Sequence, residues 1–329
     1  MKKIINNPND VVKDMLKGME LTYGELKYTP ELEVISRKEK TKKVGLVSGG
    51  GSGHEPAHAG YVGYGMLDAA VCGNVFASPS PDRILKGIEE ADTGKGVLLI
   101  VKNYSGDIMN FEMAMDLCEL DDDMIDMVIV RDDVAMEDSD FSTGRRGIAG
   151  TVLVHKIAGA MSQRGEELAE VKRVAQKTID NVRSMGMSMS ACIIPAVGKA
   201  GFEIKDDEIE IGMGIHGEAG IYKKPLMNAK DLALELVEKI TNDFNYKNSD
   251  VALMINGLGA TPLMELYIMS KEVIELLKSK NINVYKVFVG NFMTALEMAG
   301  CSVSLLKLDD ELKSLLEDKC NTPAMKNME

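Results

Sequence analysis

The sequence predicts a two-domain α/β protein, with a central β-sheet flanked by helices in each domain. Two observations lead to this fold class. Strand-like apolar runs alternate with segments of helical periodicity in both halves of the chain, and 329 residues are enough for two hydrophobic cores. The halves divide near residue 187. We therefore expect an N-terminal α/β domain at residues 1–186 and a C-terminal α/β domain at residues 187–329.

The first half contains several elements of both kinds. Residues 9–21 place apolar side chains at helical spacing and end near Gly24, which predicts an amphipathic helix. Residues 96–101 read Gly-Val-Leu-Leu-Ile-Val, the strongest buried-strand pattern in the chain. The same two patterns predict further strands at 34–37, 44–47 and 124–130, and further helices at 83–91, 108–120, 148–163 and 166–185.

The second half opens with an apolar run at 191–197. Residues 208–215 then alternate as Glu-Ile-Glu-Ile-Gly-Met-Gly-Ile, which is typical of a strand, and lead directly to His216. The remaining elements alternate along the chain. We expect helices at 229–241, 263–278 and 309–316, and strands at 250–255, 284–289 and 301–307.

Composition excludes several classes of function. A net charge of −13 argues against a nucleic-acid or anionic-membrane surface, because both require a basic stripe. The five cysteines are an odd number without CxxC spacing, so neither a disulfide framework nor a zinc site is indicated, and no metal is expected. The N-terminus lacks a secretory apolar region, and no run of eighteen apolar residues occurs. We expect a cytoplasmic protein that binds a small molecule or protein partners.

A glycine-rich loop follows the strand expected at 44–47. Four of the five residues at 49–53 are glycine, so the backbone must turn sharply and stays bare of side chains. A ligand can then touch main-chain amides. His54 follows immediately, and imidazole exchanges protons near neutrality. The loop therefore predicts chemistry on a small polar molecule; the alternative is a tight turn whose histidine only bonds its neighbours.

Two of the four histidines, His54 and His216, each follow a strand in a glycine-rich loop, and both are candidate catalytic residues. The other two, His58 and His155, are expected to be structural. Asp107 lies in a polar loop between the strand at 96–101 and a helix, the end of a strand at which open α/β sheets bind ligands. It could instead be a helix N-cap.

Lys102 is the other charged residue in the loop between the strand at 96–101 and the following helix. It could donate to a substrate oxygen or be a solvated lysine at the end of a strand. A further segment, 138–147, has loop composition and could be close to the ligand or be an ordinary surface loop. Neither the Walker A pattern nor GxGxxG fits the sequence, so the chain does not show a nucleotide site of its own.

Six short motifs together resemble the dihydroxyacetone kinase subunit K family. They occur in the family's order, and the resemblance runs from the first ten residues to the end of the chain. The motifs are SGGGSGHEP at 48–56, FASPSPD at 76–82, KNYSGD at 102–107, GRRG at 144–147, GIHGE at 214–218 and NGLGATP at 256–262.

The resemblance implies a homodimer of two-domain α/β subunits that bind dihydroxyacetone. It implies that His216 attacks the carbonyl carbon and holds the substrate as a covalent hemiaminal. His54 would accept the proton of a terminal hydroxyl, helped by Asp107. The residues that would line the substrate are Gly51, Ser52, Gly53, His54, Lys102, Asp107 and His216.

The resemblance also implies partners. ATP-dependent members continue into a helical nucleotide-binding L domain, and this chain ends at Glu329 without one. We therefore expect the substrate-binding subunit of a phosphoenolpyruvate-dependent dihydroxyacetone kinase, with no cofactor in this chain. The nucleotide (ADP/ATP) and Mg²⁺ would lie on a separate L subunit, recharged by an M subunit. One departure is Ala219, where the family commonly has proline, so this loop would be less rigid.

Three alternatives remain open at this point. Some relatives keep the ligand pocket but serve as sensors that activate a transcription regulator. The substrate could be another short ketose such as erythrulose. The phosphoryl donor could be the phosphotransferase system, or ATP acting through a separate L subunit.

Overall fold

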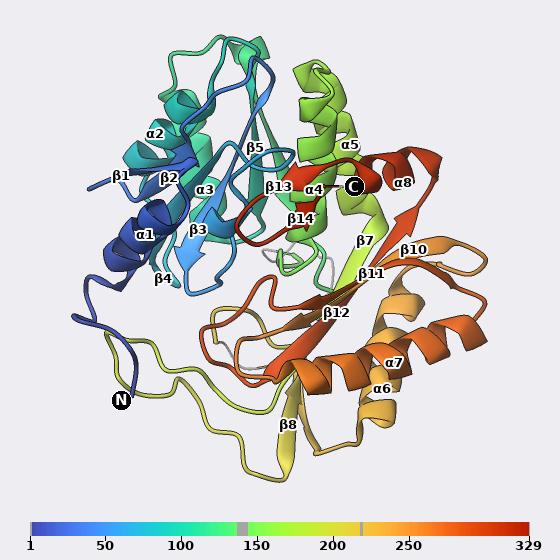
Figure 1. Ribbon diagram of the computed structural model, residues 1–329. Helices are drawn as coiled ribbons and strands as arrows, with labels where there is room; N and C mark the ends of the chain where they lie inside the picture. The colour runs from blue at the N-terminus through green and yellow to red at the C-terminus, as the bar shows by residue number, and fades with distance from the viewer. Residues whose placement is uncertain (1, 137–143, 218–219, 329) are drawn as a thin grey trace.

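The computed structural model describes residues 2–136, 144–217 and 220–328 and contains two six-stranded sheets with helices packed against them (Figure 1). The predicted fold class, two α/β domains, is confirmed. Within the described ranges, no helix combines the length and the apolar character needed to span a bilayer. Residues 138–143 of the loop singled out above, and Ala219, lie outside the described residues.

The first sheet is largely parallel. Strands β4, β3, β5 and β6 run parallel to one another, whereas the hairpin of β1 and β2 joins the edge strand β4 in an antiparallel arrangement. Parallel strands aligned in this way place their carboxyl ends along one edge of the sheet. The strand order is β1 (Leu26–Thr29), β2 (Val34–Arg37), β4 (Ala69–Val75), β3 (Gly45–Ser52), β5 (Val97–Lys102), β6 (Ile125–Val130).

Helices cover both faces of the first sheet. Alternate residues of β5 enter two different cores: Leu99 packs with α2 and α3, and Ile100 packs with α4 and α5. This two-sided burial explains why β5 reads as a continuous apolar run. Two short 3-10 helices, Ala59–Tyr61 and Asp122–Met124, complete the domain. The helices are α1 (Val11–Thr22), α2 (Pro81–Ala91), α3 (Ser105–Asp116), α4 (Thr151–Gln163) and α5 (Leu168–Asn181).

The second sheet is mostly antiparallel, with one parallel pair, β10 and β11. One face packs against helices α6 (Ala229–Asp243) and α7 (Leu263–Ser279). From the other face, Ala252 and Met254 enter the same core as α4 and the first sheet, so the two domains share a continuous apolar interior. The strand order is β11 (Asn283–Gly290), β10 (Asp250–Gly257), β12 (Gly300–Leu308), β7 (Val182–Ser188), β8 (Glu208–Ile211), β9 (Tyr222–Pro225).

The end of the chain returns to the first domain. Helix α8 (Asp310–Glu317) offers the carbonyl oxygen of Leu315 to the buried Lys156 of α4 at 2.7 Å. The short strands β13 (Cys320–Asn321) and β14 (Lys326–Asn327) form a hairpin. Next to it, the backbone N–H of Ala324 donates to Gly60 at 2.9 Å. Figure 1 shows this C-terminal segment beside the first domain rather than the second.

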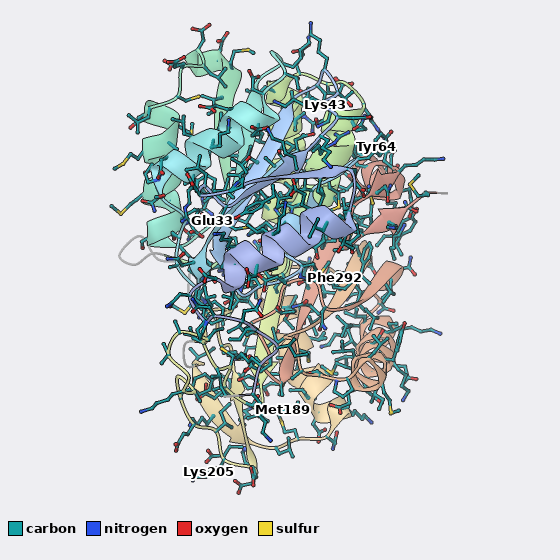
Figure 2. The ribbon with its side chains drawn as sticks, turned by 60° about the vertical axis from the view of Figure 1, so that its left-hand side comes forward. Glu33, Lys43, Tyr64, Met189, Lys205 and Phe292 are labelled. Carbon is teal, nitrogen blue, oxygen red and sulfur yellow. The ribbon has the colours of Figure 1, made fainter. Side chains whose placement is uncertain are left out.

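Side chains from both domains meet at the junction. Tyr61 of the first domain is fully buried, and its hydroxyl donates to the carbonyl oxygen of Phe292 at 2.6 Å. Phe292 is labelled in Figure 2 below helix α1, between the two domains. This contact fixes the segment after β11 against the first domain, which matters for the site described below.

Several predicted elements differ from the observed ones. The helix expected at 166–185 ends at Asn181, and residues 182–188 form β7, because they pair with β12 in the second sheet. Strands β1, β4, β9, β13 and β14 were not expected. The strand expected at 208–215 ends at Ile211, because Gly212 adopts a φ of 73° that breaks the extended backbone. The chain changes sheets at Val182; the domain limit at residue 187 stays a prediction.

Two glycines in helices should respond in opposite ways to replacement with alanine. A Cβ on Gly159 of α4 would lie 2.5 Å from Met66 Cα, a backbone clash. Gly159→Ala is therefore expected to lower the free energy of unfolding by about 1–3 kcal/mol. Gly18 of α1 has open space at that position, so Gly18→Ala should raise it by about 0.5–1 kcal/mol. Urea denaturation of the two variants measures both effects; equal effects would contradict this packing of α4.

Candidate active site

The candidate site lies where three parallel strands of the first sheet end. His54 follows β3, Phe76 follows β4, and β5 ends in Lys102. Asp107 lies in the first turn of α3, directly after β5. His216 comes from the second domain, after β8. The structure brings these residues, of which His54, Lys102, Asp107 and His216 were predicted from sequence, into one cluster. His54, Lys102 and Asp107 are buried, whereas Phe76 and His216 are half-buried.

The two histidine rings face each other. The centroids of His54 and His216 are 4.8 Å apart at an interplanar angle of 67°. Phe76 stacks on His54 at 5.2 Å, and Tyr104 meets the edge of His216 at 4.4 Å. These aromatic contacts restrict the orientation of both imidazole rings. A molecule of three carbon atoms is long enough to contact both rings.

Hydrogen bonding determines which nitrogen of His54 carries the proton. His54 Nδ1 lies 2.9 Å from the carbonyl oxygen of Thr294, an atom that can only accept. Nδ1 is therefore the protonated nitrogen, and Nε2 keeps a lone pair. Among the described residues, the buried Nε2 has no hydrogen-bond partner. His54 is thus oriented as a proton acceptor.

Thr294 is itself held by the loop that carries His54. Its N–H donates to the His54 carbonyl oxygen at 3.1 Å, and its hydroxyl donates to the carbonyl oxygen of Glu55 at 2.8 Å. With the N–H of Leu296, which donates to the carbonyl oxygen of Gly53 at 2.7 Å, four hydrogen bonds join the segment after β11 to the glycine-rich loop. The position of His54 depends on both domains.

Both imidazoles are neutral at physiological pH. Burial lowers the pKa of His54 well below its usual value, and the neighbouring His216 and Lys102 lower it further. Burial, together with the positive charges of Lys102 and Arg146, lowers the pKa of His216 to about 3. A neutral ring keeps a lone pair on one nitrogen, which a nucleophile or a base requires.

Lys102 and Asp107 form a buried ion pair. Lys102 Nζ lies 3.2 Å from Asp107 Oδ2, and the two side chains are 0% and 2% exposed. Ser78 donates a hydrogen bond to the other carboxylate oxygen. The alternative that Lys102 is a solvated lysine at the end of a strand is therefore wrong. Asp107 is not the N-cap either, because Tyr104 occupies that position and α3 begins at Ser105.

The glycines of the loop make room for these groups. Gly50 has a φ of 148°, and a Cβ there would lie 2.6 Å from Lys102 Nζ. Gly53 has a φ of 103°, and a Cβ there would lie 2.7 Å from the Phe76 ring. Larger residues would displace the lysine or the aromatic ring. The loop is bare partly because charged and aromatic side chains approach it closely.

The remaining predicted site residues, Gly51 and Ser52, lie at the end of β3. A Cβ on Gly51 would lie 2.7 Å from the backbone nitrogen of Ala77, so the two loops pack tightly here. The hydroxyl of Ser52 donates to the carbonyl oxygen of Gly73 at 2.7 Å. The hydroxyl proton of Ser52 is therefore already used in a hydrogen bond to β4.

Four other residues of the site were not predicted to be functional: Phe76, Ser78, Tyr104 and Thr294. The first three lie within the motifs FASPSPD and KNYSGD. No sequence pattern around Thr294 indicates a role in the site, because Thr294 comes close to His54 only in the folded protein. His58 and His155 are buried in the first domain, with ring centroids 5.3 Å apart.

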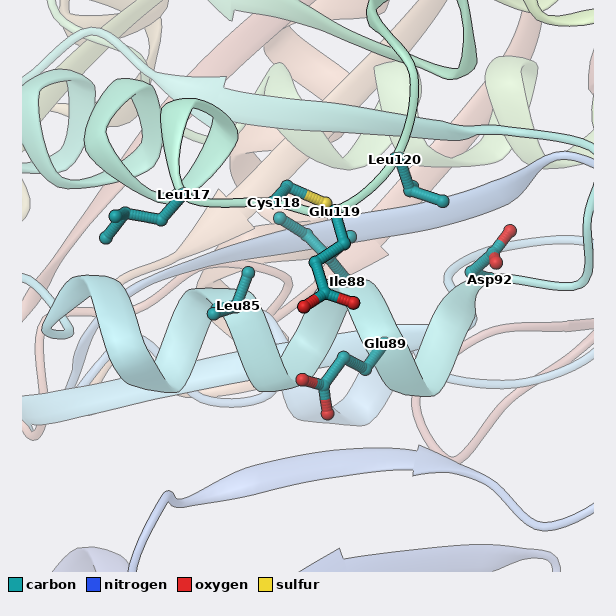
Figure 3. Close-up of a pocket in the computed structure, with 8 residues that line it drawn as sticks. All are labelled: Leu85, Ile88, Glu89, Asp92, Leu117, Cys118, Glu119 and Leu120. Carbon is teal, nitrogen blue, oxygen red and sulfur yellow. The ribbon is translucent and has the colours of Figure 1, made fainter.

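Two negative observations concern the described residues only. Within residues 2–136, 144–217 and 220–328, no three His, Cys, Asp or Glu side chains are grouped to hold a metal ion. A surface cavity of about 380 Å³ lies between α2 and the segment 117–120 (Figure 3). Its lining includes Leu85, Ile88, Glu89 and Asp92, and it contains none of the predicted site residues.

The fold and the candidate site define a two-domain α/β protein in which one imidazole from each domain meets at strand ends. Comparison with protein families places it more narrowly. The Dak1 domain model matches residues 17–324. The chain therefore belongs to the Dak1 family of dihydroxyacetone kinases, which is the family its motifs resemble.

Individual relatives agree with this assignment. The chain is 54% identical over 314 residues to the dihydroxyacetone-binding subunit DhaK of a PTS-dependent dihydroxyacetone kinase from Listeria innocua, covering 94% of this chain and 95% of the relative. The dihydroxyacetone kinase of C. freundii superimposes with a TM-score of 0.91 at 35% identity, over 99% of this chain and 60% of that one. The dihydroxyacetone kinase operon co-activator DhaQ superimposes with a TM-score of 0.90 at 36% identity, over 94% and 97%.

Proposed function

We propose that this protein is a dihydroxyacetone-binding subunit of a dihydroxyacetone kinase. It would act as a phosphotransferase with an alcohol group as acceptor. One observation carries the proposal: a neutral His54, with its lone pair on a buried Nε2, faces His216 of the other domain, and the two ring centroids are 4.8 Å apart. The printed function of the Listeria innocua relative supports the choice of ligand.

Capture of the ketone is the first step. A neutral His216 nitrogen attacks the carbonyl carbon, a carbon–nitrogen bond forms, and the carbonyl π electrons move to oxygen. The oxygen gains one proton and the ring loses the proton of its other nitrogen, so the hemiaminal and the ring are both neutral. Glycerol has no carbonyl and cannot form this bond, which gives the site its selectivity.

Transfer of phosphate is the second step. The bound substrate presents a terminal hydroxyl to His54 Nε2, which accepts its proton while Asp107 supports the developing charge. The phosphoryl group would arrive nearly in line from a nucleotide on an L subunit. That subunit would carry Mg²⁺ and be recharged by an M subunit of the phosphotransferase system. No cofactor would reside in this chain. We also propose that the protein forms a homodimer and acts in the cytoplasm.

The experiment that tests this function is turnover. Purified protein, an L subunit and a phosphoryl donor should convert dihydroxyacetone to its phosphate. A protein that binds the ketone but yields no phosphate would instead be a sensor, an alternative supported by its similarity to the co-activator DhaQ. Supplying either ATP or the phosphoenolpyruvate-dependent M subunit identifies the donor.

The substrate is tested separately by intact-protein mass spectrometry. Dihydroxyacetone should add one substrate mass to the protein without a leaving group. Erythrulose, which is one hydroxymethylene unit longer, is the matched comparison. A larger adduct fraction with erythrulose at equal concentration would make the longer ketose the substrate.

Adduct formation should not depend on pH between about pH 5 and about pH 8. A histidine with an unperturbed pKa of about 6.5 would lose roughly tenfold of its neutral form at about pH 5.5. The pKa of His216 is lowered to about 3, so its neutral form dominates throughout this range and is lost only as the pH falls toward that value. Mass spectrometry of samples quenched at each pH measures the adduct. Weakening that begins near pH 6.5 would show that the nucleophile titrates normally.

A further inference from the structure

The GRRG motif places an arginine between the two domains beside the site. Arg146 follows β6 and precedes α4. Its Nε donates to Asp133 Oδ2 at 2.9 Å, and its Nη2 donates to the carbonyl oxygen of Gly212 at 2.8 Å. One planar guanidinium therefore binds two acceptors on different segments of the chain.

The first acceptor, Asp133, is buried and held in place by hydrogen bonds. Its side chain is 1% exposed. Its Oδ1 accepts the N–H of Ala135 at 2.9 Å, and its own N–H donates to the carbonyl oxygen of Arg146 at 3.1 Å. The carboxylate, the backbone and the guanidinium thus hold one another in a single arrangement. Arg146 cannot shift without breaking several of these bonds.

The second acceptor lies at the start of the segment that carries His216. Gly212 directly follows β8 and has a φ of 73°, and its N–H donates to the carbonyl oxygen of Gly186 of β7 at 2.8 Å. A Cβ on Gly212 would lie 2.7 Å from Ile221 Cδ1, so the turn is also tightly packed. His216 follows four residues later. The carbonyl that Arg146 binds therefore sets where this segment leaves the second sheet.

The adjacent arginine offers a natural comparison. Arg145 also joins the two domains, but its Nη1 donates to Asp243 Oδ2 at the end of α6, at 3.0 Å. Arg183 of β7 donates to the same carboxylate oxygen at 2.8 Å. Arg145 thus stabilises the packing of the domains at α6, whereas Arg146 binds the segment that leads to His216.

We propose that Arg146 is a positioning residue for His216. By holding the Gly212 carbonyl against Asp133, it keeps the imidazole of the second domain opposite His54 of the first. The inference rests on the proposed function, because it concerns the histidine that would capture the ketone. Arg146 acts through the loop and does not itself react.

The effect should fall on capture of the ketone. A reacting group displaced by about 1 Å can lose on the order of a hundredfold in rate or occupancy. In Arg146→Gln, the amide cannot bridge both acceptors, and His216 is no longer fixed. The dihydroxyacetone concentration for half-maximal adduct, and the KM for turnover, should rise on the order of 10- to 100-fold. The kcat at saturating ketone should change much less, because His54 and Asp107 keep their contacts.

The test is a titration with dihydroxyacetone, read by intact-protein mass spectrometry, on the unaltered protein, Arg146→Gln and the matched Arg145→Gln. Thermal unfolding is measured for each. We expect Arg145→Gln to bind as the unaltered protein does, even if its melting temperature falls. Arg146→Lys retains a positive charge near Asp133 but lacks the planar guanidinium that donates to two acceptors at once. It should be intermediate, and it replaces Arg146→Gln in the comparison if that variant does not fold.

Two results would overturn the inference while the proposed function stands. One is an adduct on Arg146→Gln that forms at the same concentration as on the unaltered protein. The other is equal weakening in Arg145→Gln, which would assign the effect to domain packing in general. A failure of the unaltered protein to form any adduct would instead overturn the proposed function, and this inference with it.

Discussion

Replacing His216 with alanine is expected to abolish the covalent adduct with dihydroxyacetone completely. The variant lacks the nitrogen that forms the bond to the carbonyl carbon. Without that bond, a ketone of so few atoms has little surface with which to bind, so turnover should fall below detection. Intact-protein mass spectrometry at saturating ketone measures the adduct, and thermal unfolding confirms that the variant is folded.

His54→Asn is the matched control for this experiment. The asparagine amide can still donate a hydrogen bond, but it cannot accept the hydroxyl proton as Nε2 of His54 would. We expect this variant to keep the adduct and to lose phosphate transfer. An unchanged adduct in His216→Ala would show that the nucleophile lies elsewhere. His54, whose ring centroid is 4.8 Å from that of His216, would then be the next candidate for the nucleophile.

Replacing Asp107 with asparagine should separate capture from transfer in the opposite direction. His216 is unaltered, so the adduct should form at nearly the same ketone concentration. Phosphate transfer should fall on the order of a hundredfold or more, because the carboxylate no longer supports proton removal by His54. The measurement is kcat with a saturating L subunit and donor, beside the adduct titration.

Ser78→Ala provides the control for Asp107. It removes the hydroxyl that donates to one carboxylate oxygen but leaves the negative charge and the ion pair with Lys102. We expect only a modest fall in kcat. Equal rates for Asp107→Asn and the unaltered protein would reduce the carboxylate to a counterion for the buried lysine, whose charge would otherwise be unpaired.

The fold class, and the residues that the structure brings together in the candidate site, could be predicted from the sequence because both leave local patterns. The buried run of β5 and the alternation before His216 are visible in short windows. The density of glycines before His54 predicted a loop whose amides a ligand can touch; that the side chains of Lys102 and Phe76 approach these glycines closely was not predicted. Such signals depend only on neighbours in the chain.

What the sequence could not show depends on tertiary contacts. Residues 182–185 continue a helical pattern, yet pairing with β12 makes them a strand, because sheet hydrogen bonds outweigh local propensity. Thr294 fixes the tautomer of His54 from 240 residues away. The ionic pairing of Asp107 was likewise invisible, because a carboxylate in the first turn of a helix is equally typical of a cap.

The return of the C-terminal segment to the first domain affects how the protein is made. Tyr64 accepts the N–H of Asn321, and Cys320 and Met325 are buried in the core that contains α4. The first domain therefore cannot close its interior while the ribosome is still synthesising the second. Part of its apolar surface therefore stays exposed, and accessible to chaperones, until nearly the whole polypeptide has been synthesised.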